Sequence, residues 1–124
     1  MIFNAFGPPD VLHYEDVPDP APGPGDLLIE VHAVSVNRVL DVDIRAGRAP
    51  HYGVEPPHIL GVDPSGVVID VGSDVQGFAA GDRVSVTMGM PGGGRYGLEC
   101  NGGDAQLTIA PAASCVKVRD EIGF

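Results

Sequence analysis

Short runs of apolar residues, separated by turn residues, set the pattern of the chain. Most runs are rich in β-branched residues, several alternate apolar with polar positions, and Gly, Pro or Asp closes nearly every one, as expected of strands joined by tight turns. The predicted strands are Ile2–Phe6, Val11–Val17, Leu27–Val36, Gly66–Val71, Arg83–Val86, Ala105–Ala110 and Cys115–Val118. Many short strands with little helix predict an all-β (mainly β) domain of barrel-like form.

The strands Gly66–Val71 and Arg83–Val86 stand at the centre of this pattern. The chain has to reverse between them, and Gly72 and Gly81 stand at the reversal points, where a left-handed backbone (φ > 0) is often needed. This segment is therefore predicted to be a small antiparallel β unit with tight turns.

A single segment changes from the strand period to a helical one. It covers Arg38–Ala46, with Asn37 before it as a candidate N-cap and Gly47 at its end. Asp41 and Arg45 are spaced to form an i, i+4 ion pair on this helix. The apolar stripe consists of Val39, Leu40, Val42, Ile44 and Ala46. We therefore expect one main short helix.

Two connections are unusual in composition. Pro18–Asp26 holds four prolines and is predicted to be an extended surface connection, because proline disfavours both helix and central strand. Thr87–Asp104 holds seven glycines and is long for a loop in a compact domain, which is typical of functional or mobile loops. Within it, Gly92–Gly97 matches the G-x-G-x-x-G dinucleotide motif by letter. Because no helix-forming segment follows, we interpret it as a flexible loop.

Composition and charge exclude several classes of function. The 124 residues suit one domain, and seven Lys and Arg against seventeen Asp and Glu give a net charge of -10 without a basic cluster. Binding to a nucleic acid backbone needs clustered cations and is not expected. The chain has no apolar stretch of about 18 residues that would predict a membrane span, and its N-terminus lacks signal-peptide features. Cys100 and Cys115 are expected to be free thiols, and the expected location is the cytoplasm.

Metal binding is the first chemistry that the side chains suggest. A zinc site needs three or four S, N or O donors in tetrahedral arrangement, and its motifs place some of them at close spacings such as Cys-x-x-Cys. The candidate donors are His51, His58, Asp63, Cys100 and Cys115. No such spacing occurs among them, so the residues themselves do not favour a metal site.

One stretch resembles a known family. It reads Pro57-x-x-Leu60-Gly61-x-Asp63-x-x-Gly66-Val67-Val68-x-x-Val71-Gly72, then Val75-x-x-Phe78 and Gly81-Asp82-Arg83-Val84. The combination is similar to the signature of the GroES-like N-terminal domain of medium-chain dehydrogenases and reductases. The resemblance covers nearly the whole chain and implies a distorted β-barrel over residues 1–124, with one main short helix. It also implies that the chain is the half that shapes the substrate pocket, without the Rossmann nucleotide-binding half.

The chain departs from the zinc-dependent members of this family. Zinc-dependent alcohol dehydrogenases have a Cys in the segment that here reads Ser35-Val36-Asn37, and a Gly-His-Glu where this chain has Gly61-Val62-Asp63. The four-cysteine structural lobe is also missing, since the Thr87–Asp104 loop holds Cys100 alone. These departures imply an enzyme without zinc.

The same positions resemble quinone oxidoreductases and related zinc-independent enoyl reductases. Those proteins carry Val-Asn-x-x-Asp followed by Arg-x-Gly, which here corresponds to Val36-Asn37, Asp41 and Arg45-Ala46-Gly47. By this resemblance, Asn37 lies near the nicotinamide end of NADPH, Asp41 is a second cofactor-binding residue and Tyr52 is the catalytic residue facing the substrate. One extra residue separates Asn from Asp in this chain, so Asp43 is the alternative to Asp41. The residues alone equally allow Asn37 as a helix cap and Tyr52 as a packed loop aromatic.

The resemblance implies an NADPH-dependent reductase of quinones or α,β-unsaturated carbonyl compounds. Its partners would be a small-molecule substrate and a Rossmann domain in cis or in trans, and a homodimer is one arrangement open to the full-length enzyme. The isolated chain is expected to bind NADPH poorly and to be inactive. Two alternatives stay open: a binding or assembly module such as a co-chaperonin, with Met88–Pro91 as its mobile loop, and a truncated gene product without activity.

Overall fold

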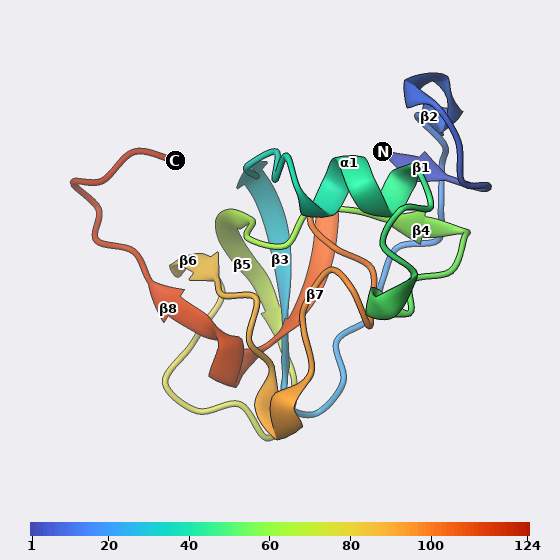
Figure 1. Ribbon diagram of the computed structural model, residues 1–124. Helices are drawn as coiled ribbons and strands as arrows, with labels where there is room; N and C mark the ends of the chain where they lie inside the picture. The colour runs from blue at the N-terminus through green and yellow to red at the C-terminus, as the bar shows by residue number, and fades with distance from the viewer.

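Eight short strands form two antiparallel sheets in the computed structural model, which describes residues 1–124 (Figure 1). The strands are β1 (Ile2–Phe3), β2 (Leu12–His13), β3 (Asp26–Ala33), β4 (His58–Ile59), β5 (Ser65–Val71), β6 (Arg83–Val86), β7 (Leu107–Pro111) and β8 (Cys115–Lys117). The larger sheet has the order β7-β3-β5-β6-β8 and the smaller one the order β2-β1-β4. The prediction of a mainly β fold is confirmed.

Helical structure is limited to short segments. The α-helix α1 (Leu40–Arg45) lies at the top of Figure 1, between the end of the large sheet and the small sheet. It is shorter than the predicted Arg38–Ala46, because the residues before Leu40 form a turn. The 3-10 helices are η1 (Pro9–Val11), η2 (Pro50–Tyr52), η3 (Pro91–Gly93) and η4 (Ala112–Ser114). None of the helices has the length and hydropathy that crossing a bilayer requires.

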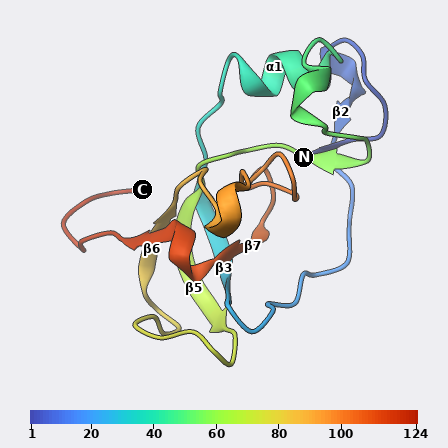
Figure 2. The ribbon, with the colours of Figure 1, turned by 60° about the horizontal axis from the view of Figure 1, so that its bottom comes forward.

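The proline-rich connection follows β2 and precedes β3. Residues 14–23 form neither helix nor strand, as the prolines predict. Figure 2 shows this segment running along the outside of the molecule before it enters the large sheet.

The apolar side chains form two separate clusters. The first lies between α1 and the small sheet and consists of Phe3, Leu40, Ile44, Ala49, Val54, Leu60, Val62 and Leu98. The second lines the large sheet and consists of Leu27, Ile29, Val68, Val84, Val86, Tyr96, Ala110 and Cys115. Leu40 and Ile44 belong to the predicted helix stripe, whereas Val39 precedes the helix and is exposed. The helix therefore covers the first cluster with fewer residues than the sequence pattern predicts.

The two glycines at the predicted reversal points are required for different reasons. Gly81 has a φ of 94°, in the left-handed region that glycine adopts without a Cβ penalty. Gly72 has no such φ, so that part of the prediction is wrong. A Cβ at Gly72 would instead overlap the carbonyl oxygen of Gly23. Gly72 is thus required by the close approach of the chain segment that leads into β3.

Candidate functional site

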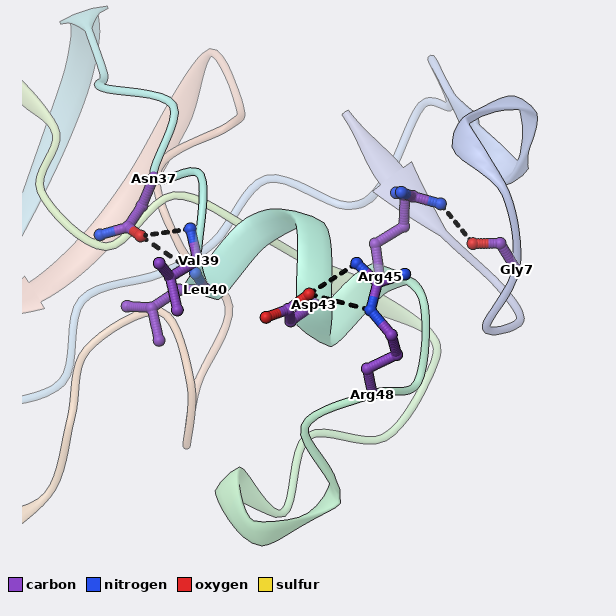
Figure 3. A network of polar contacts seen from close by, with 7 residues as sticks. All are labelled: Gly7, Asn37, Val39, Leu40, Asp43, Arg45 and Arg48. Atoms are coloured by element: carbon purple, nitrogen blue, oxygen red, sulfur yellow. Dashed lines mark hydrogen bonds and ion pairs between the residues drawn. The ribbon is translucent and has the colours of Figure 1, made fainter.

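Asn37 organises the first turn of α1. Its Oδ1 accepts hydrogen bonds from the backbone N–H groups of Val39 (3.1 Å) and Leu40 (3.0 Å), as Figure 3 shows. Asn37 therefore makes the hydrogen bonds predicted for a helix cap, although Val39 occupies the position directly before the helix, which begins at Leu40. The amide nitrogen of Asn37 points away from α1 in Figure 3.

Asp41 is paired with Asn37 through the backbone. Its Oδ2 accepts a hydrogen bond from the Asn37 N–H (2.6 Å), and its own N–H donates to the Asn37 carbonyl (2.9 Å). The side chain is nearly inaccessible to solvent, with an exposed fraction of 7%, and Oδ1 has no hydrogen-bond partner. Burial raises the pKa of Asp41 to about 6, and the negative charges of Asp104 and Asp63 add to the rise. The structure therefore brings two of the predicted site residues into direct contact.

The charged residues around α1 do not pair as the sequence predicts. Arg45 donates through Nη1 to the carbonyl oxygen of Gly7 (Figure 3). The expected Asp41–Arg45 ion pair does not form. Asp43 instead accepts hydrogen bonds at Oδ1 from Nη2 (2.6 Å) and Nε (3.0 Å) of Arg48. The two candidate aspartates thus differ: Asp43 is a half-buried ion-pair partner, and Asp41 is buried beside Asn37.

Ser35 and Asp63 form a contact that the sequence did not predict. The Ser35 hydroxyl lies 2.8 Å from each carboxylate oxygen of Asp63. Asp104 enters the same region because its N–H donates to the carbonyl of Leu60 (2.9 Å). Burial raises the pKa of Asp104, the positive charge of the N-terminal amine opposes this rise, and the charge of Asp63 adds to it. The region around the start of α1 is therefore rich in carboxylates.

Tyr52 lies at the end of η2 and forms no hydrogen bond with these carboxylates. It is half-buried against the first apolar cluster, and no hydrogen bond joins it to Asn37 or Asp41. The centroid of the His51 ring lies 4.2 Å from that of Tyr52, and the guanidinium carbon of Arg95 lies 5.0 Å above the Tyr52 ring. Arg95 comes from the long glycine-rich loop, so this loop packs onto the predicted catalytic residue.

The glycine-rich loop lacks the features of a dinucleotide site. No α-helix follows Gly97, as the sequence predicts. Met90 packs against the second apolar cluster and Arg95 contacts Tyr52. The Met88–Pro91 segment is therefore held partly against the domain rather than projecting as a free apolar arm.

The candidate metal donors do not come together as a group in this structure. No group of three or more His, Cys, Asp and Glu side chains is placed to hold a metal ion. His58 is buried, and its Nε2 lies 2.9 Å from the Gly97 carbonyl, to which it donates. Burial lowers the pKa of His58 and raises that of Cys115 to about 11, so both are neutral groups of the interior. Cys100 is exposed and stands alone.

Comparison with known proteins places this geometry in a family. Residues 23–120 match the family described as Alcohol dehydrogenase GroES-like domain. The chain is 40% identical over 85 residues to sorbitol dehydrogenase of Ovis aries, covering 68% of this chain and 23% of that protein. It is 38% identical over 90 residues to quinone oxidoreductase of Pseudomonas aeruginosa, covering 73% of this chain and 27% of that protein. The chain thus spans about a quarter of the length of these relatives.

Solved structures give the same result. A structure of an NAD-dependent alcohol dehydrogenase superposes with a TM-score of 0.90 at 33% identity, covering 99% of this chain and 40% of that one. A quinone oxidoreductase from Coxiella burnetii superposes with a TM-score of 0.80 at 32% identity, covering 99% of this chain and 37% of that one. The chain therefore belongs to the alcohol dehydrogenase GroES-like domain family of the medium-chain dehydrogenase/reductase superfamily.

Proposed function

We propose that the chain is the substrate-pocket half of an NADPH-dependent oxidoreductase that reduces quinones or α,β-unsaturated carbonyl compounds without zinc. It would act with a Rossmann nucleotide-binding domain, supplied in cis or in trans. Relatives named for quinone reduction and for polyol oxidation match it almost equally, so overall similarity does not choose between them. The side chains of the candidate site favour quinone reduction.

The contact between Ser35 and Asp63 carries the proposal. The zinc-dependent enzymes that the chain resembles place sulfur and imidazole ligands in these two segments. Here the Ser35 hydroxyl is hydrogen-bonded to both oxygens of Asp63, and Val62 is buried in the first apolar cluster. Valine offers no ligand, and a hydroxyl and one carboxylate do not make the three-ligand set of a catalytic zinc site.

The remaining polar groups suit hydride transfer to a polarised carbonyl compound. Bound NADPH would supply the hydride, and the protein's part is to orient the reactants and manage the proton. The outward amide nitrogen of Asn37 would donate a hydrogen bond to the nicotinamide end of the cofactor. The Tyr52 hydroxyl would donate to the substrate carbonyl oxygen, and Arg95, stacked on its ring, would help to hold the ring in place.

A chimeric enzyme tests the proposed function. This chain would replace the matching N-terminal region of the Pseudomonas aeruginosa quinone oxidoreductase, and NADPH oxidation would be followed with a benzoquinone and with an enone. We expect quinone- or enone-dependent oxidation that a chelator does not change. Oxidation of sorbitol with NAD⁺, restored by zinc and abolished by the chelator, would instead assign the polyol chemistry of the other relatives.

The isolated chain is expected to keep the same melting temperature when NADPH is added. The α1 helix has only six residues, and its first N–H groups already donate to Asn37, so no helix N-terminus is left for the pyrophosphate. Differential scanning calorimetry over a range of NADPH concentrations measures this, with ATP as the control for nonspecific anion effects. A saturable rise with NADPH alone would mean that a nucleotide site lies within these residues.

A further inference from the structure

The last six residues fold back over the outer face of the large sheet. We refer to residues 119–124 as the C-terminal arm. Figures 1 and 2 show the chain leaving β8 and turning back towards the sheet. Within the arm, the N–H of Ile122 donates to the carbonyl of Arg119 (3.1 Å), which forms a turn. The arm is thus a structured return and not a simple extension of β8.

Arg83 contacts the arm at both of its ends. Its Nη1 donates to the carbonyl oxygens of Arg119 (2.9 Å) and Asp120 (3.1 Å). Its guanidinium carbon lies 4.2 Å above the ring of Phe124. Hydrogen bonds from a charged donor are stronger than neutral ones, and an arginine stacked on an aromatic ring adds a cation–π interaction. A single side chain of β6 therefore holds both the start and the end of the arm.

The end of the arm also contacts strand β3, which shares its outer face with β5 and β6. Arg83 on β6 pairs with Val67 on β5, which pairs with Glu30 on β3, so the three side chains share the outer face. His32 is two residues beyond Glu30 on the same face, and its ring centroid lies 4.8 Å from that of Phe124. The Phe124 ring thus lies against groups from β6 and β3, with β5 between them.

We propose that Arg83 is a positioning residue that fixes the direction in which the chain leaves this domain. In the longer enzyme of the proposed function, the arm leads towards the nucleotide-binding domain. Arg83 then sets how that domain presents its cofactor to the pocket. The ordering of the arm does not depend on the proposed function, whereas its effect on catalysis does.

The ordering of the arm is tested on the 124-residue chain by backbone ¹⁵N relaxation. We expect order parameters for residues 120–124 near the rigid value of about 0.85 in the wild type, and below about 0.6 in Arg83→Gln. Arg83→Lys keeps the charge and is expected to recover part of the order. Arg119→Gln is the matched control, because it removes a neighbouring positive charge while leaving the carbonyl that Arg83 binds. Phe124→Ala removes the far contact alone and should loosen only the end of the arm.

The catalytic consequence is measured in the chimeric enzyme. Because small misplacements of the reactants are costly, Arg83→Gln is expected to lower kcat by about tenfold with little change in the KM for the quinone. Arg119→Gln should leave both constants unchanged. A mobile arm in the wild type, equal order in Arg83→Gln, or an equal loss of kcat in both variants would overturn the inference. An inactive wild-type chimera would count against the proposed function, and the relaxation data would still decide whether Arg83 orders the arm.

Discussion

Replacing Gly66 with alanine is expected to destabilise the domain by at least about 3 kcal/mol, more than a typical overpacking substitution. Gly66 lies in β5 and pairs with Val31 of β3 at the centre of the large sheet. A Cβ at this position would overlap the carbonyl oxygen of Glu30 and lie 3.0 Å from Cα of Val31. Both are backbone atoms, so no side-chain rotation relieves the overlap. Urea unfolding followed by circular dichroism measures the loss.

Gly25→Ala is the matched control for this substitution. Nothing lies within 4 Å of a Cβ at Gly25, and its φ is not left-handed. Its effect should therefore stay within about 0.5 kcal/mol of the wild type. An unfolding midpoint for Gly66→Ala that equals that of Gly25→Ala would show that β3 and β5 separate without cost. The close pairing described for these strands would then be wrong.

The sequence predicted the elements whose signals are local. The strand positions follow from short apolar runs, and the Asn37 cap follows from one side chain and the two N–H groups after it. The same local rules failed for the Asp41–Arg45 pair, although its spacing is suitable. Arg45 donates instead to Gly7, which is 38 residues away in sequence. A helix rule cannot anticipate a backbone carbonyl that another element brings to the helix.

Non-local contacts account for most of what the sequence did not predict in the candidate site. Ser35 and Asp63 are 28 residues apart and meet because the β3–α1 connection and the β4–β5 connection come together. Arg95 reaches Tyr52 from a loop whose composition suggested flexibility and gave no partner. The requirement for glycine at position 72 likewise comes from Gly23, in the chain segment before β3. In each case the sequence pointed to a residue or segment of interest, whereas the residue that it contacts depended on how distant parts of the chain come together.

Asp41→Asn is expected to stabilise the domain at neutral pH and to reduce the pH dependence of its stability. Burial raises the pKa of Asp41 from 3.8 to about 6, so the folded state binds this proton more tightly than the unfolded state does. The contribution of Asp41 to the free energy of unfolding is therefore fully present below about pH 4 and is lost as the pH rises through about 6. At about 1.4 kcal/mol per pKa unit, the loss is at most about 3 kcal/mol. Thermal unfolding of both proteins between about pH 4 and pH 8 measures it.

The asparagine side chain explains the direction of this effect. Its oxygen can still accept the N–H of Asn37, while its amide carries no charge to repel Asp63 and Asp104. Asp43→Asn on the same helix is the control, because Asp43 is partly exposed and paired with the exposed Arg48, and surface pairs contribute about 0 to 1 kcal/mol. The pH profile of Asp43→Asn should therefore follow that of the wild type. If Asp41→Asn were instead less stable than the wild type at neutral pH, the ionised carboxylate would be the form that the fold stabilises.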